Sequence, residues 1–317
     1  MSAVEIHPDV EATAEQIASM EIRGAATIAG AAAGALGTQA EHVAAQSPEE
    51  FRTEIRAAAR MLLDTRPTAV SLPNALRYVF QKMAGETVEQ LRGSTVAAAR
   101  EFQRRLDTAQ DDLGKIGANR LRDGDTVLTH CHSTDALACI EHAREQGKEL
   151  SAVVKETRPR KQGHITARQL REMGVPVTLI ADNAAGRYLD EVDHVFVGAD
   201  SIAADGSVVN KIGTRSLAVT ARERDTPIVV AAQTLKLDPA TLSGHTVEIE
   251  TRDEAEVISD EDRDSIGDIE VANPAFDVTP PRYVDAIVTE RGQFPPESIV
   301  MVMRELFGEQ LRTPWEE

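Results

Sequence analysis

The chain has 317 residues, of which 42% are apolar and 27% charged, and this composition is typical of a folded protein with a sizeable core and about two domains. No apolar run approaches the roughly 20 residues of a membrane helix, since the nearest, Ile28 to Leu36, is short and rich in Ala and Gly. The first ten residues lack the pattern of a secretory signal. The net charge of −18 argues against a surface that binds nucleic acid, which requires clustered cations.

The basic residues are unevenly divided between seven lysines and 27 arginines. An acidic, lysine-poor, alanine-rich surface is what we expect of a halophilic protein, because concentrated salt screens the self-repulsion. The alternative is an ordinary acidic cytoplasmic protein. Cys131 and Cys139 are too few for a disulfide framework, so we expect free thiols and a cytoplasmic location.

The first 122 residues have the pattern of a helical domain. Apolar residues recur at helical spacing, and no alternation typical of strands is visible. Two prolines between Thr65 and Asn74 interrupt the pattern. The expected helices are Val10–Met20, Gly24–Leu36, Pro48–Leu63, Ala75–Met83 and Val88–Ile116. We therefore predict a helical N-terminal domain over residues 1–122.

The pattern changes at Asp123-Gly124-Asp125, after which short apolar runs alternate with helical segments. The expected strands are Thr126–Thr129, Ala152–Lys155, Val177–Ala181, His194–Val197, Ile228–Ala231 and Ala286–Thr289. The expected helices are Ser133–Gln146, Thr166–Met173, Ala184–Leu189 and Thr214–Arg224. This alternation predicts an α/β domain over residues 123–317, with a parallel sheet covered on both faces. The acidic stretch Asp253–Asp268 is expected to be a surface excursion.

Reactive side chains follow several of these strands. In an open parallel sheet, ligands bind beyond the carboxyl ends of the strands. A sheet built only for stability does not need a thiol, imidazoles, carboxylates and cations at one edge, so we expect a functional site there. The residues concerned are His130, Cys131, His132, Glu156, Arg158, Asp182, Asp200 and Lys236.

Two predicted helix starts at this edge, at Ser133 and within Asn210–Thr214, can bind an anion through backbone N–H groups. The first helix would also lower the pKa of Cys131. The alternative is plain helix capping by Ser133 and Thr214. Two such starts together with nearby cations favour a phosphate. The cations are Arg158, Lys211 and Lys236.

Other kinds of site are not expected. His130-Cys131-His132 could suggest a metal, but consecutive strand residues point to opposite faces and no second cluster has ligand spacing. The dinucleotide, P-loop and nucleophile-elbow motifs are missing, so no cofactor is expected. In the helical half, Arg23 and Arg66 stand beside a glycine and a proline, where the backbone can approach a ligand. A surface ion pair is the alternative for each.

Taken together, six segments resemble the family of ribose 1,5-bisphosphate isomerases over nearly the whole chain. They are Met20–Ala25, Thr65–Val70, Thr129–Ser133, Gly198–Ile202, Asn210–Thr214 and Asn273–Pro280. The superfamily also contains methylthioribose 1-phosphate isomerases and the regulatory α, β and δ subunits of translation initiation factor 2B. The isomerases carry a catalytic cysteine and aspartate where this chain has Cys131 and Asp200, whereas the regulatory subunits generally lack the cysteine. The Cys-His-Ser context resembles the ribose bisphosphate branch, since the methylthioribose enzymes tend to have Asn after the cysteine.

The resemblance implies a Rossmann-like C-terminal domain, a homo-oligomer (dimer or hexamer) and a place in archaeal nucleotide (AMP) salvage. There, ribose 1,5-bisphosphate becomes ribulose 1,5-bisphosphate for a RuBisCO. Ala26 is a departure, because close relatives often have a second glycine there. The substrate-binding residues implied by position are Arg23, Gly24, Ala25, Ala26, Arg66, Ser133, Asn210, Lys211 and Lys236.

The chemistry explains why such an enzyme needs an acid and a base. The anomeric oxygen of the substrate is esterified, so the ring must open by expelling its own oxygen from C1, which requires a proton donor. We assign Asp200 as this acid, with a raised pKa, and Cys131 as the base at C2, with a lowered pKa. A direct hydride shift from C2 to C1 is the alternative chemistry. The alternative functions are a regulatory subunit of the initiation factor 2B type and a methylthioribose 1-phosphate isomerase.

Overall fold

A computed structural model describes residues 5–67, 69–244, 247–308 and 313–316, so Thr68 of the segment Thr65–Val70 lies outside the described residues. The chain divides into a helical unit, Met1–Ala109 with Gln310–Glu317, and an α/β unit, Gln110–Glu309. We had placed the division at residue 122. It falls earlier because the last residues of a long helix, among them Leu113 and Ala118, pack into the core of the α/β unit.

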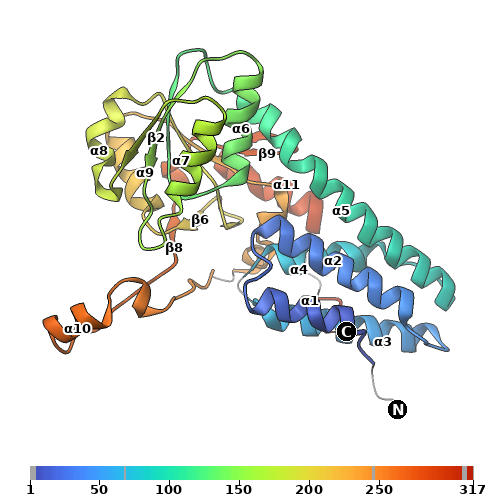
Figure 1. Ribbon diagram of the computed structural model, residues 1–317. Coiled ribbons are helices and arrows are strands. Elements are labelled where there is room, and N and C mark those ends of the chain that lie inside the picture. Colours follow the sequence, from blue (N-terminus) through green and yellow to red (C-terminus); the bar gives the residue numbers. More distant parts are fainter. Residues whose placement is uncertain (1–4, 68, 245–246, 309–312, 317) are drawn as a thin grey trace. The chain divides into compact units, whose positions relative to one another are not determined.

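The helical unit contains α1 to α4 and the first part of α5 (Figure 1). Their bounds are Pro8–Ala18, Ala25–His42, Pro48–Thr65, Ser71–Lys82 and Val88–Ala118. Small residues let α2 approach its neighbours closely. A Cβ atom built on Gly37 would lie 3.0 Å from Cβ of Ala99 in α5. The near-continuous run of small residues in α2 therefore serves helix packing.

The predicted helices of this unit are present, with one difference at α4. We expected Thr65–Asn74 to break the helical pattern, but Thr65 ends α3 and α4 already begins at Ser71. Pro73 lies in the first turn of α4, where the missing N–H would have no partner inside the helix. A proline at that position does not interrupt a helix.

The α/β unit is built on a seven-stranded sheet of order β10-β9-β7-β4-β1-β2-β3. Six strands run parallel, which confirms the predicted sheet, and only β10 is antiparallel, beside β9. The strands are β1 (Thr126–Thr129), β2 (Ser151–Lys155), β3 (Val177–Ile180), β4 (His194–Val197), β7 (Ile228–Ala231), β9 (Ala286–Thr289) and β10 (Gly292–Phe294).

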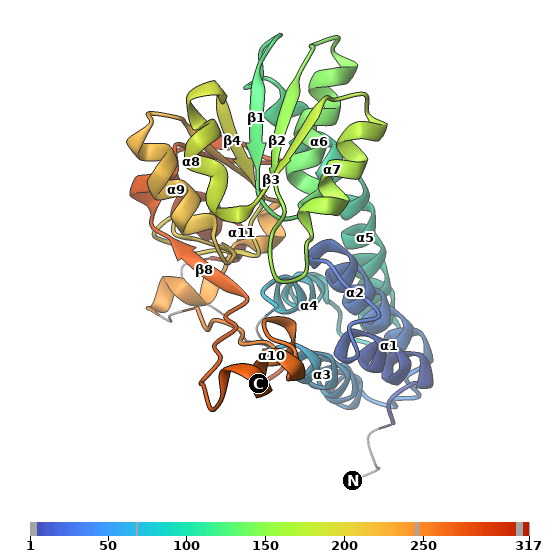
Figure 2. The same cartoon turned by 60° about the vertical axis from the view of Figure 1, so that its left-hand side comes forward.

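Helices cover both faces of this sheet, with α6 and α7 on one side and α8 and α9 on the other (Figure 2). In β4, Val195 and Val197 pack into one core, and Phe196 between them packs into the other. Because both faces are buried, the strands are continuous apolar runs. The helices are α6 (Thr134–Glu145), α7 (Gly163–Glu172), α8 (Ala185–Tyr188), α9 (Thr214–Glu223), α10 (Asp260–Ile266) and α11 (Ile299–Phe307).

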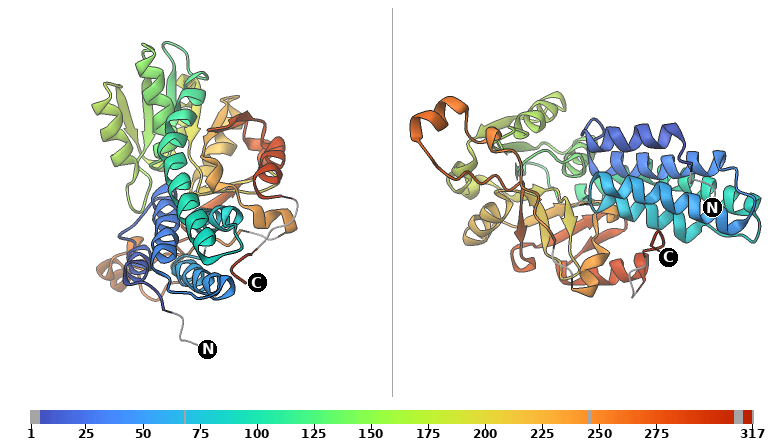
Figure 3. Two further views of the ribbon diagram at one scale, coloured as in Figure 1. Left: turned by 90° about the vertical axis from the view of Figure 1, so that its right-hand side faces the viewer. Right: turned by 90° about the horizontal axis from the view of Figure 1, so that it is seen from below.

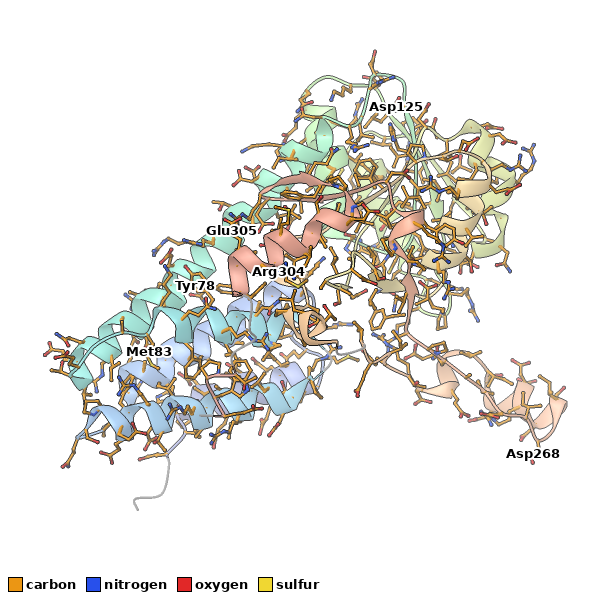
Figure 4. All side chains as sticks on the ribbon, turned by 180° about the vertical axis from the view of Figure 1, so that it is seen from behind. Tyr78, Met83, Asp125, Asp268, Arg304 and Glu305 are labelled. Carbon is orange, nitrogen blue, oxygen red and sulfur yellow. The ribbon has the colours of Figure 1, made fainter. Side chains whose placement is uncertain are left out.

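A second, antiparallel sheet of order β5-β6-β8 was not predicted. Its strands are Ser201–Ile202, Val208–Lys211 and Phe276–Thr279. The stretch Asp253–Asp268 is mostly exposed, contains α10, and extends away from both sheets (Figures 3 and 4). None of the helices that the structure describes is both long and apolar enough to cross a membrane.

Candidate active site at the carboxyl edge of the sheet

Cys131 and Asp200 follow two neighbouring strands, β1 and β4, which pair in parallel. Cys131 is buried, whereas the Asp200 side chain is open to solvent. The two side chains are close enough for the Asp200 charge to raise the pKa of the Cys131 thiol. The structure thus brings the two predicted reacting groups to one edge of the sheet.

The backbone of Cys131 has an unusual conformation, with φ 69°, a left-handed value that a residue with a side chain rarely adopts. Two threonine hydroxyls bind its peptide groups. Thr157 Oγ1 accepts the Cys131 N–H at 2.8 Å, and Thr166 Oγ1 donates to the Cys131 carbonyl at 2.8 Å. The turn that carries the thiol is therefore held from both sides.

The histidines on either side of Cys131 bind these threonines. His130 Nδ1 lies 3.3 Å from Thr157 Oγ1, and His132 Nδ1 lies 3.2 Å from Thr166 Oγ1. Burial, together with the Lys155 charge, lowers the pKa of His130 to about 4, so its ring is neutral near pH 7. Among the residues that the structure describes, no three His, Cys, Asp or Glu side chains gather as metal ligands would.

The predicted lowering of the Cys131 pKa is wrong. Burial raises the pKa of the thiol to about 11, and the Asp200 charge acts in the same direction. The charges of Lys211 and Arg252 and a hydrogen bond from the His132 backbone lower it, but by less. The helix start near Cys131 can be predicted from the sequence, but the burial of the sulfur away from water cannot. That burial has the largest effect on the pKa of the thiol.

The pKa of Asp200 is raised, as an acid acting near pH 7 requires. Desolvation by the protein around the carboxyl raises this pKa, although solvent still reaches part of the side chain. The nearby charges of Lys236, Lys211 and Arg252 counteract this shift by favouring the carboxylate. Asp200 therefore combines access to a ligand with a pKa that is raised toward the range of a proton donor.

The two helix starts that we expected to bind anions differ. Ser133 caps α6 by accepting the Ala136 N–H at 3.2 Å, as the capping alternative proposed. At α9, the chain supplies its own anion, because the Asp277 carboxylate accepts the N–H groups of Gly213 at 2.7 Å and Arg215 at 3.0 Å. Thr214 does not cap this helix, since its hydroxyl donates to the carbonyl of Lys211.

The remaining predicted residues of this unit lie at the same edge in different settings. Lys211 is buried, and its Nζ donates to the Ala275 carbonyl at 3.0 Å. The amide of Asn210 donates to Thr214. Lys236 forms a largely buried ion pair of 2.8 Å with Asp135.

Arg252 is a candidate that the sequence did not reveal. It lines a small pocket together with Lys211 and Arg158, the exposed arginine that follows β2. Its charge acts on Cys131, Lys211 and Asp200 alike. A short ribbon holds it, in which the Arg252 N–H donates to the carbonyl of Asn273 at 2.9 Å. No spacing or motif marks this arginine, because the ribbon lies outside the strand pattern.

The other predicted substrate-binding residues belong to the helical unit. Arg23 is exposed, and Gly24 forms the N-cap of α2 with φ 92°, a backbone conformation that favours a glycine. Ala25 and Ala26 lie in the first turn of α2. Arg66 is the C-cap residue that follows α3.

Comparison with known proteins defines the class. The chain belongs to the initiation factor 2 subunit family, whose model matches residues 21–296. A solved structure of similar fold, described as the Pyrococcus horikoshii OT3 translation initiation factor eIF-2B, has a TM-score of 0.78 and 32% identity, covering 93% of this chain and 99% of that chain.

Within the family, the relatives are more specific. The chain is 69% identical to a ribose 1,5-bisphosphate isomerase of Haloferax volcanii, covering 98% of this chain and 97% of the relative. It is 67% identical to one of Haloterrigena turkmenica, covering 98% of each. A methylthioribose-1-phosphate isomerase of Pelotomaculum thermopropionicum is 40% identical, covering 88% of this chain and 81% of the relative.

Proposed function

We propose that the protein is an isomerase that converts ribose 1,5-bisphosphate to ribulose 1,5-bisphosphate. The observation that carries this conclusion is the pair Cys131 and Asp200 at the carboxyl ends of neighbouring strands, in a chain 69% identical to a relative of that name. A regulatory subunit would not need a thiol and an acid of raised pKa at one edge. The sequence after Cys131 and the higher identity to the bisphosphate enzymes favour this substrate over methylthioribose 1-phosphate.

The chemistry follows from the two protonation states. Asp200 in its neutral form donates a proton to the ring oxygen as the C1–O bond breaks. Cys131 as thiolate removes the proton from C2, which gives an enol whose C1 oxygen still carries the phosphate. This enol becomes the 2-ketone as its hydroxyl proton passes to Asp200 and Cys131 returns a proton to C1. Because burial keeps the thiol protonated in the free protein, the thiolate must form when the substrate is bound, and the charges of Lys211 and Arg252 stabilise it.

The two phosphates of this substrate require several cations. In the α/β unit, Arg158, Lys211 and Lys236 serve this role and Arg252 joins them, while Ser133 and Asn210 supply uncharged hydrogen-bond donors. In the helical unit, the binding residues are Arg23, Gly24, Ala25, Ala26 and Arg66. Guanidinium groups suit phosphate because they donate two parallel hydrogen bonds in a fixed geometry.

The setting of the reaction is part of the proposal. Ribose 1,5-bisphosphate arises from nucleoside monophosphates such as AMP by phosphorolysis, and its ketose isomer is the RuBisCO substrate. We place the protein in cytoplasmic nucleotide salvage of a halophilic archaeon, as a homo-oligomer. The net charge of −18 and the Haloferax relative support the halophilic setting. A melting temperature that does not rise in multi-molar KCl would contradict it.

The decisive assay offers ribose 1,5-bisphosphate and methylthioribose 1-phosphate separately and detects the ketose products. We expect turnover of the bisphosphate, and a loss of about 10² to 10⁴ in kcat for Cys131→Ser and for Asp200→Asn. Cys139→Ser, at the other free cysteine, is the matched control. Turnover of the monophosphate alone, or full activity of Cys131→Ser, would reject the proposal.

The route at C2 is tested with substrate deuterated at that carbon. Loss of the label to water supports removal of a proton by Cys131, since a thiol exchanges its proton with solvent. Retention of the label at C1 supports a direct hydride shift, in which case Cys131 has another role.

A further inference from the structure

We propose that Thr157 and Thr166 are positioning residues that hold Cys131 in its reactive conformation. Each hydroxyl binds one peptide group of Cys131 and one of the histidines on either side of it. We call these four residues, His130, His132, Thr157 and Thr166, the threonine clamp. The inference rests on the proposed role of Cys131 and goes beyond it, because it assigns a role to the histidines on either side of Cys131.

The direction of each hydrogen bond follows from the partners. The Ile212 carbonyl can only accept, so His130 Nε2, at 2.8 Å from it, carries the proton. The ring is neutral, so its Nδ1, 3.3 Å from Thr157 Oγ1, can accept the hydroxyl proton, which the Lys155 carbonyl at 3.1 Å can also accept. The oxygen of Thr157 remains free to accept the Cys131 N–H. A chain of hydrogen bonds thus runs from the loop before α9 to the backbone of Cys131.

The second half of the clamp mirrors the first. The Thr166 hydroxyl donates its proton to the Cys131 carbonyl, so its oxygen can accept from His132 Nδ1. Each half therefore contains one peptide group, one hydroxyl and one imidazole.

The two threonines of the clamp are held by a hydrogen bond and by close packing against β2. Thr157 and Thr166 are each 1% exposed, so they act through Cys131 and not on a ligand directly. The Thr157 N–H donates to Asp182 Oδ1 at 2.9 Å. Thr166 lies in α7, which begins so close to β2 that a Cβ on Gly163 would be 1.8 Å from the Lys155 carbonyl oxygen. Both hydroxyls are therefore fixed before any substrate arrives.

This arrangement determines where the sulfur points. A left-handed residue with a side chain persists only where its surroundings impose it. If one hydroxyl is lost, Cys131 can relax to an ordinary turn and its sulfur can move toward water. The reaction then loses its aligned base, although the pocket for the phosphates remains.

The test replaces each hydroxyl by a methyl group, in Thr157→Val and Thr166→Val, and restores it in Thr157→Ser and Thr166→Ser. Thr226→Val is the matched control, since Thr226 is also buried, at 6% exposed, and its hydroxyl binds the Leu189 carbonyl, outside the clamp. The readouts are kcat, KM and the pH midpoint of Cys131 alkylation by iodoacetamide, with the modified peptide identified by mass spectrometry to separate it from Cys139.

We expect each valine variant to lower kcat at least tenfold with KM within twofold. The alkylation midpoint should fall from about 11 toward that of an exposed thiol. Both serine variants and Thr226→Val should resemble the native protein. Native kcat and a native midpoint in the valine variants would overturn the clamp, as would serine variants that fail to rescue. If Thr157→Val does not fold, the Thr166 pair decides.

The failure of the clamp and that of the proposed function are distinguishable. Alkylation reports on Cys131 whether or not the protein turns over ribose 1,5-bisphosphate. An inactive native protein with shifted midpoints in the valine variants keeps the clamp and rejects the function. An active native protein, together with valine variants whose alkylation midpoints are unshifted, keeps the proposed function and rejects the clamp.

Discussion

The Asp277 carboxylate binds the backbone N–H of Gly213 at 2.7 Å and so occupies the start of α9 with an anion from the chain itself. Asp277→Ala should leave the N–H groups of Gly213 and Arg215 without this acceptor, at a cost of about 1–3 kcal/mol in the free energy of unfolding. Inorganic phosphate, added at constant ionic strength, should then raise the melting temperature of the variant more than that of the native protein. Equal shifts in the melting temperatures of both proteins would show that phosphate does not bind to the N–H groups of Gly213 and Arg215 in the variant.

The buried His130 makes the stability of the fold dependent on pH. Its folded-state pKa of about 4 lies below the unfolded value of 6.5, so the unfolded chain binds the proton first as the pH falls. The stability that depends on the neutral ring is complete above pH 6.5 and is lost as the pH falls through 4, by about 3 kcal/mol. In urea titrations at one salt concentration, the curves of the native protein and His130→Gln should converge by that amount between pH 7 and 4. Parallel curves would contradict this assignment.

The raised pKa values of Asp200 and Cys131 predict the shape of the pH profile. Catalysis requires neutral Asp200 and the Cys131 thiolate, and the pKa values of both groups are raised, that of the thiol to about 11. The fraction of the protein that carries both forms is constant between the two pKa values, so kcat/KM should be flat there and fall on either side.

Asp200→Asn provides the control for this profile. Without the titrating carboxyl, the residual kcat/KM should rise about tenfold per pH unit from neutrality toward pH 11, because only the thiol still titrates. If kcat/KM of Asp200→Asn were still independent of pH over this range, a group other than Asp200 would be the proton donor.

Variants of the buried ion pair between Lys236 and Asp135 can distinguish a structural role of Lys236 from a role in phosphate binding. Lys236→Met leaves the Asp135 carboxylate, which is 1% exposed, without its cation, and should destabilise the fold by about 3–5 kcal/mol. The double variant Lys236→Met with Asp135→Asn should recover most of that loss. If Lys236 also binds a phosphate, KM for the bisphosphate should stay raised in the double variant. A native KM there would leave Lys236 a purely structural residue.

Most of the large sheet was predictable because its inner strands are buried on both faces. β1, β4, β7 and β9 have the bounds that the apolar runs indicate. The small sheet escaped prediction because β6 and β8 carry Asn210, Lys211 and Asp277 within four-residue strands, which removes the apolar pattern. Two of the residues that obscure the strand pattern, Asn210 and Lys211, belong to the proposed site.

The site was predictable only where the chain itself marks it. Cys131 and Asp200 each follow a strand, so the topology of a parallel sheet predicts that they meet at one edge. The threonine clamp joins residues 26 and 35 positions apart through single hydrogen bonds, which leave no periodic signal in a sequence. Burial of the sulfur, which reverses the expected pKa shift, is equally invisible before the chain is folded.

Trp315 follows the whole α/β unit in the chain, yet its side chain is 5% exposed and packs in the core of the helical unit, against Phe80 and beneath the guanidinium of Arg77. During synthesis the ribosome adds this residue only after the α/β unit has been made. The helical unit, most of which is translated first, therefore completes its core after the α/β unit, and the nascent chain lacks a tryptophan beside α4 until then.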